Sequence, residues 1–157
     1  MNTIILLIGI VALGLVIYIF IDIFKNKKVV GVYTCKNGGI VNKYVNRLEI
    51  LLPGSIGNIT FTSYDISDIE KFSNEAYDFM NKFNDVKEII AKYLNDVGKD
   101  IGMNIKEWNF VDVNLDEYED GNISVIINTP KNKEIKWGIS LDINFRTNEI
   151  SNFELCH

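Results

Sequence analysis

Histidine, proline, arginine and cysteine are all scarce in this chain of 157 residues. The only histidine is the last residue, His157, and there are two prolines, two arginines and two cysteines. Because chain ends fray, a terminal histidine is a poor general base, and we therefore exclude catalytic triads that need one. The two cysteines form no Cys-x-x-Cys pair, which disfavours a zinc or redox site.

Positive charge is also in short supply. The sequence holds 16 Lys and Arg against 21 Asp and Glu, a formal net charge of −5. Proteins that bind nucleic acid need a surplus of Lys and Arg to neutralise phosphates. The charge balance therefore predicts no nucleic-acid partner, whereas an acidic surface suits a basic protein partner.

Charge of either sign is absent from residues 3–21. As a helix, this segment spans about 28 Å, close to the hydrocarbon thickness of a bilayer. No basic residue precedes it and no small-residue cleavage site follows it, which disfavours a cleaved signal peptide. The sequence thus predicts a transmembrane helix that contacts the lipid bilayer through residues 3–21, and a single-pass protein of the cell membrane.

Three lysines follow that segment, at Lys25, Lys27 and Lys28. Because positive flanks stay on the cytoplasmic side, we expect the rest of the chain to lie in the cytoplasm. The predicted organisation is a membrane anchor with its basic flank over residues 1–28 and an acidic α+β domain over residues 29–157. Cys35 and Cys156 lie near the two ends of this domain, and the sequence leaves open whether they pair; in the cytoplasm they would be reduced.

The first half of the domain predicts strands and then helix. Residues 29–35 are rich in β-branched residues and indicate a strand, and Arg47–Leu52 with Gly57–Ser63 predict a β-hairpin. Apolar residues then recur every three or four positions over residues 67–98, which predicts one long or two short amphipathic helices. A capping box over Ser67–Glu70 marks the start, and Asn84-Asp85 is the place for a break. We interpret the stripe of Phe72, Phe79 and Phe83 as core packing.

The last third alternates between apolar and polar residues. Four strands are predicted, at Ile105–Leu115, Asn122–Asn128, Glu134–Phe145 and Glu149–Cys156. Their short connections predict a four-stranded antiparallel β-meander. The fold class is therefore α+β, with one N-terminal transmembrane helix, a β-hairpin, the helical segment and the meander. Trp108 and Trp137 are expected to fill the core.

The densest acidic run, residues 112–121, has the wrong spacing for a calcium site. Asp112, Asn114 and Asp116 match the first three ligand positions of a calcium loop, but the bidentate carboxylate at the twelfth position is missing, where the chain has Ile123. We interpret the run as a solvated hairpin loop. The sequence therefore predicts no catalytic, cofactor-binding or metal-binding residue and no cofactor.

Several short motifs of the domain, taken in chain order, form a pattern that can be compared with other proteins. They are Ala76-x-x-Phe79, Val86-x-x-Ile89-Ile90-x-x-Tyr93-Leu94, residues 137–143 and Asn148-Glu149-Ile150. In this order, the chain resembles small bacterial domains of unknown function, some of which are found beside toxin genes and regarded as immunity proteins. The resemblance covers residues 46–156, implies a small α+β domain without an established activity, and carries over no functional residue.

These observations favour a non-enzymatic, membrane-anchored binding or interaction protein with a protein partner, immunity-like in its most concrete form. Two alternatives stay open: a structural subunit of a membrane or secretion assembly, and a carboxylate-dependent enzyme.

Overall fold

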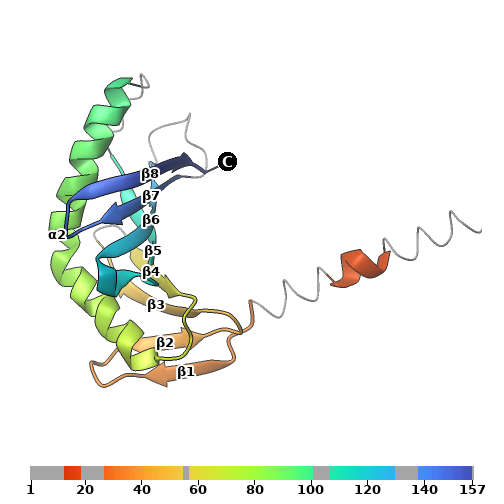
Figure 1. Cartoon of the computed structure of the whole chain (residues 1–157). Helices are drawn as coiled ribbons and strands as arrows, with labels where there is room; N and C mark the ends of the chain where they lie inside the picture. Colours follow the sequence, from red (N-terminus) through yellow and green to blue (C-terminus); the bar gives the residue numbers. More distant parts are fainter. Residues whose placement is uncertain (1–12, 19–26, 55–56, 101–106, 130–137, 157) are drawn as a thin grey trace, which may run out of the picture.

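The described part of the domain consists of one sheet of eight strands, one long helix and a short 3₁₀ helix (Figure 1). The computed structural model describes residues 13–18, 27–54, 57–100, 107–129 and 138–156. Its elements are β1 (Gly31–Thr34), β2 (Ile40–Lys43), β3 (Leu48–Pro53), β4 (Asn58–Ser63), α2 (Ile69–Asp100), β5 (Asn109–Asn114), the 3₁₀ helix η1 (Tyr118–Asp120), β6 (Asn122–Asn128), β7 (Ile139–Asn144) and β8 (Glu149–Leu155).

The strands follow one another across the sheet in chain order, from β1 to β8. All neighbours are antiparallel except β4 and β5, which run parallel, with Phe61 opposite Val113. Parallel neighbours need a long crossover, and α2 supplies it. The predicted fold class is therefore wrong: the four strands of the expected meander do not form a separate sheet but continue the one that β1 to β4 begin.

The predicted transmembrane helix is corrected as well. No helix in the described parts of the chain is long and apolar enough to cross a membrane. Of the predicted span, residues 13–18 are helical, and its remaining residues lie outside the described part. The long helix of the structure is instead α2, which is amphipathic and carries charge along its length. Three further predictions depended on that helix and are corrected with it. They are the single-pass architecture, the cell-membrane location and the orientation inferred from the lysines.

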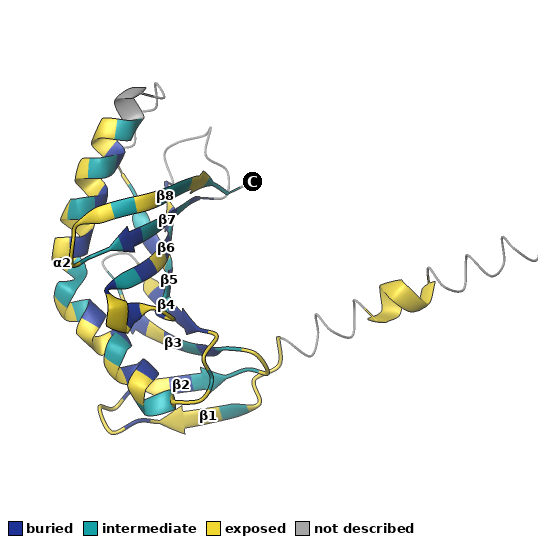
Figure 2. Ribbon diagram, in the orientation of Figure 1, coloured by how far each residue is buried: buried dark blue, intermediate teal, exposed yellow. Residues whose placement is uncertain are grey.

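The core lies between α2 and the sheet (Figure 2). Buried apolar residues recur along α2 every three to seven positions, because only one side of an amphipathic helix faces the sheet. They are Phe72, Ala76, Phe79, Val86, Ile90 and Leu94. The Phe79 ring contacts three other rings, with centroid distances of 5.5 Å to Phe61, 6.1 Å to Phe110 and 6.5 Å to Phe83. This confirms the interpretation of the aromatic stripe as core packing.

Helix α2 is continuous from end to end, so of the two predicted alternatives the single long helix is correct. Its N-cap is Asp68, one residue later than the predicted Ser67. The Lys71 N–H donates to Asp68 Oδ1 at 2.9 Å, which satisfies one of the free donors of the first turn. The Ser67 hydroxyl donates to Asp65 instead.

Two remaining expectations concern single side chains. Cys35 and Cys156 are both free thiols. Trp108 is half-buried beside Phe110, with ring centroids 5.3 Å apart, so it packs against the core and does not fill it as predicted. Trp137 lies outside the described residues.

Candidate binding groove beside helix α2

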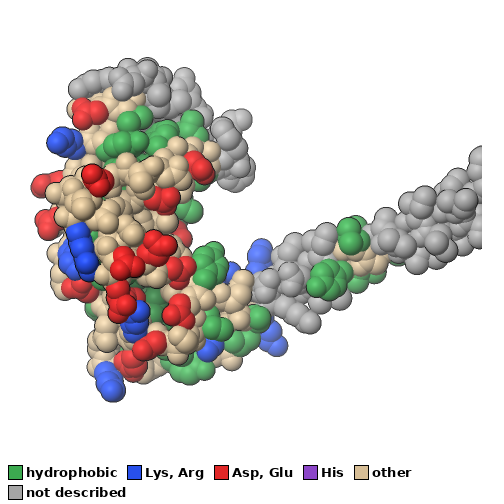
Figure 3. All heavy atoms as spheres, viewed as in Figure 1, with side chains coloured by type: hydrophobic (Ala, Val, Ile, Leu, Met, Phe, Trp, Pro, Cys, Tyr) green, Lys and Arg blue, Asp and Glu red, His purple; other side chains and the backbone are tan. Residues whose placement is uncertain are grey.

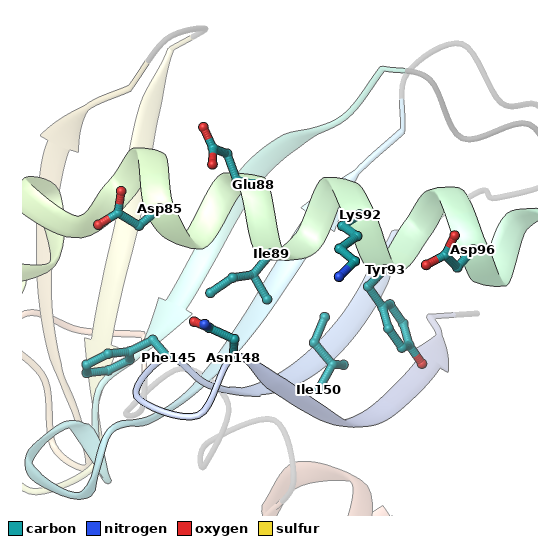
Figure 4. Close-up of a pocket in the computed structure, with 9 residues that line it drawn as sticks. All are labelled: Asp85, Glu88, Ile89, Lys92, Tyr93, Asp96, Phe145, Asn148 and Ile150. Atoms are coloured by element: carbon teal, nitrogen blue, oxygen red, sulfur yellow. The ribbon is translucent and has the colours of Figure 1, made fainter.

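Two adjoining cavities lie along one side of α2, and we call them together the α2 groove. The larger has a volume of about 760 Å³ and lies between the C-terminal half of α2 and the β7–β8 turn (Figure 4). It is lined by Asp85, Glu88, Ile89, Lys92, Tyr93, Asp96, Phe145, Asn148 and Ile150. The second, about 610 Å³, continues toward the start of α2 and η1 and shares Phe145 with the first.

The floor of the larger cavity is apolar. Ile89 and Tyr93 come from α2, and Phe145 and Ile150 come from the end of β7 and from β8. All four are half-buried, because they lie at the margin of the interface between α2 and the sheet. The Tyr93 ring also packs against Phe153, 6.3 Å away between centroids. Part of this apolar surface is therefore exposed to solvent, and charged side chains surround it.

Three polar side chains join α2 to η1 in the second cavity. The Tyr118 hydroxyl donates to Asp78 Oδ2 at 2.7 Å, and the Lys82 ammonium donates to the same oxygen at 2.5 Å and to Tyr118 at 3.1 Å. Lys82, with help from Tyr118, holds the pKa of Asp78 below its usual range, while burial raises the pKa of Tyr118 to about 12. Since each group has a partner, this cluster fixes η1 rather than offering a reactive group.

A second set of polar contacts holds the same corner. Lys71 Nζ lies 3.1 Å from Glu119 and 3.9 Å from Glu75, and the Arg146 guanidinium donates to the carbonyl oxygen of Glu119. Burial raises the pKa of Glu75, whose side chain is only 15% exposed. These contacts place Arg146 and the β7–β8 turn against η1, and so define one wall of the groove.

The rim of the groove is acidic. Eight acidic and four basic side chains line the two cavities. Asp85 and Glu88 are exposed and line the larger cavity, although in Figure 4 their carboxylates point away from Asn148 and Ile150. Asp and Glu side chains gather over this side of the molecule (Figure 3). An apolar floor within an acidic rim is suited to a ligand that is both apolar and positively charged.

On the sheet face that points away from α2, one mostly polar row of side chains crosses all eight strands. In order, the row is Val32, Asn42, Glu49, Thr62, Asn114, Ser124, Asp142 and Asn152. Its members bond to one another: the Ser124 hydroxyl donates to Asp142 at 2.6 Å, and the Asn152 amide donates to Asp142 at 3.3 Å. This row marks the sheet face opposite the core.

Asp112 lies on the same face and is the one strongly perturbed carboxyl of the described residues. Burial raises its pKa to about 6, although the Thr62 hydroxyl donates to it at 3.3 Å. It lines neither cavity of the α2 groove. Among the described residues, no group of His, Cys, Asp and Glu is arranged to hold a metal ion. A displaced pKa without a pocket and a second reacting group is weak support for catalysis.

The acidic run that resembles a calcium loop is divided between several roles. Asp112 and Asn114 belong to β5, so the interpretation as a solvated hairpin loop is wrong for them. Asp116 accepts hydrogen bonds from the Ser63 hydroxyl at 2.7 Å and the Tyr64 N–H at 2.8 Å. It therefore anchors the connection between β4 and α2 and is occupied by the protein itself.

The groove residues did not stand out in the sequence. Tyr93 and Phe145 are 52 positions apart, and each fits the apolar pattern of its own element. The one available signal was Tyr118, an isolated aromatic residue inside an acidic run, which turns out to bond to the helix.

Comparisons of the chain with protein-family models, with curated proteins and with solved structures found no match.

Proposed function

We propose that this protein is a non-enzymatic binding domain that receives a basic segment of a partner protein in the α2 groove, as an immunity-like inhibitor of a basic toxin would. The observation that carries the proposal is the apolar floor of Ile89, Tyr93 and Ile150 inside a rim of carboxylates. The apolar floor supplies affinity by removing surface from water, and the carboxylates select the charge of the partner and speed its approach.

The rest of the molecule supports the same choice of partner. Its net charge is −5, so its long-range field attracts positively charged proteins and repels acidic ones. The resemblance to immunity-like domains, although it carries over no residue, favours the same class of function.

The test is a binding titration with a fluorescent amphipathic peptide made of lysine and leucine, followed by anisotropy. We expect the double variant Asp85→Lys with Glu88→Lys to weaken binding by at least about tenfold, because it reverses two charges at the rim. The control of equal charge is Glu107→Lys with Glu154→Lys, since both are exposed carboxylates that line neither cavity. We expect it to have little effect beyond the change in net charge, which is the same in the two double variants.

A peptide made of glutamate and leucine tests the sign of the charge. It should bind much more weakly than the lysine peptide at low salt, and the difference should shrink as salt screens the rim. Equal losses for the groove variant and the control would contradict the proposal, because binding would then follow net charge and not the groove.

A further inference from the structure

A second surface lies at the far end of the sheet from β8. β1 is the first strand of the sheet and pairs only with β2 among the described residues. Its residues are unusually exposed for apolar side chains: Val32 is 63% exposed and Tyr33 is 43% exposed, and Val30 just before the strand is 57% exposed. No residue from 29 to 35 is charged.

Among the described residues, nothing pairs with the hydrogen-bonding groups on the outer side of the β1 backbone. The Cys35 N–H donates to the Gly39 carbonyl at 2.8 Å, and Tyr33 lies opposite Val41. Because bonded and non-bonded residues alternate along an antiparallel edge, the N–H and C=O of Val32 and Thr34 point away from β2. A strand laid along this edge would complete the ladder.

The other edge of the sheet is protected in the ways that natural sheets use. β8 carries two exposed glutamates, Glu149 and Glu154, and its register shifts opposite Asp142 and Ile143. Charges and bulges discourage the addition of a further strand. β1 has neither a charge nor a register shift, so it lacks the features that discourage strand addition at β8.

The chain segment that contains β1 is basic, whereas the rest of the domain is acidic. Residues 27–48 contain five basic side chains and no acidic one, whereas residues 49–157 contain ten basic and 20 acidic side chains. Lys27 and Lys28 precede β1 and Lys36 follows it. Apolar side chains lie beside both basic and acidic ones at this end of the molecule (Figure 3), where the Lys36 N–H donates to the Glu70 carboxylate at 3.2 Å.

We propose that β1 docks an extended segment of a partner protein, uncharged along the strand and acidic at its ends, which adds to the sheet as a further strand. The free backbone groups of Val32 and Thr34 bind the segment, and the lysines at both ends of β1 select its acidic flanks. On the face away from α2, Val32 and its neighbour Ile40, 58% exposed, offer apolar contact to the incoming side chains.

This surface is independent of the α2 groove. The groove suits a basic segment and β1 suits an acidic one, so loss of one interaction leaves the other in place. The failure of either proposal is therefore recognised separately.

The experiment uses the full chain labelled with ¹⁵N and two synthetic peptides. The first has a centre of alternating threonine and valine with two glutamates at each end, and the second has lysines in place of the glutamates. We expect the acidic peptide to bind at least about tenfold more tightly at low salt. Its addition should shift the amide signals of Val32 and Thr34, while those of β8 stay unchanged.

Variants of both partners test the role of the backbone. Val32→Pro removes one outward donor on an edge strand, where proline is tolerated, and Val32→Thr is the matched control that keeps the donor. The first should abolish peptide binding and the second should preserve it. Should Val32→Pro disturb the fold, the acidic peptide N-methylated at every second amide asks the same question of the unaltered protein, and it should not bind.

Three results would overturn the proposal: equal binding of the acidic and basic peptides, binding that survives both Val32→Pro and N-methylation, or no binding up to about 1 mM peptide, an affinity too weak for a specific site. Concentration-dependent dimerisation that Val32→Pro abolishes, observed without any peptide, would also contradict it, because the occupant of β1 would then be a second copy of this chain.

Discussion

Phe79→Ala should cost the domain about 4–5 kcal/mol of unfolding free energy, near the upper end of the range for deleting a buried phenylalanine. Phe79 is completely buried at the middle of the core, and its ring meets those of Phe61, Phe110 and Phe83. The first two lie on the parallel pair β4 and β5. Truncation therefore opens a cavity where α2 contacts the strands that it connects.

Aromatic pairs add about 0.5–1.5 kcal/mol each beyond the burial of their surface, which is why we place the loss near the upper end. Urea denaturation followed by tryptophan fluorescence measures it, with an unchanged slope as the sign that the folded state is intact. Tyr77→Ala is the control on the outer side of the same helix, where Tyr77 is 37% exposed, and it should cost about 1 kcal/mol or less. A loss below about 1.5 kcal/mol for Phe79→Ala would refute the packing of α2 on the sheet through this ring.

Three further predictions concern the helix cap, a buried carboxyl and a glycine. Asp68→Ala should cost about 1 kcal/mol in the same assay, because the Lys71 N–H loses its acceptor. Burial raises the pKa of Asp112 to about 6 in the folded state, so its ionised form destabilises the fold. The unfolding free energy should therefore fall as the pH rises from about 4 through 6. Asp112→Asn should therefore raise the melting temperature at pH 7 and leave it nearly unchanged at pH 4; the same shift at both values would disprove the assignment. Gly138→Ala should cost about 1–3 kcal/mol, since φ is +125° there and a Cβ would lie 2.7 Å from the carbonyl oxygen of Ile127. A neutral result in thermal melting would show that this backbone is not held as described.

Local patterns predicted most elements of the fold. Alternation located β3 and β4 as a hairpin, and the four C-terminal strands contain β5 to β8. The period of 3.6 located α2, although its cap moved from Ser67 to Asp68. These features depend on neighbours a few residues apart, and such interactions can be recognised from spacing alone.

Two features of the fold depended on more than local pattern. β2 has only four residues, of which Val41 alone is buried, so it shows no alternation to recognise. The parallel pairing of β4 and β5 depends on where a 32-residue helix returns the chain, and no spacing within either strand reports it. This is why a hairpin and a separate meander were predicted where one mixed sheet exists.

The predicted transmembrane helix shows a related limit. A run of uncharged residues satisfies the length and hydropathy of a membrane span, but these are properties of a window and not of a folded helix. The described structure contains no helix that meets both conditions. The groove could not be predicted, because Ile89, Phe145 and Ile150 fit the pattern of ordinary core residues. Only the fold shows that they are half-buried and line a cavity.

Binding of a basic segment in the α2 groove can be mapped by ¹H–¹⁵N NMR with the lysine–leucine peptide. We expect the largest amide shifts on residues 85–96 of α2 and on Asn148 and Ile150 across the groove, with β1 and β2 unchanged. Shifts spread evenly over the acidic surface, or concentrated away from these two segments, would contradict it.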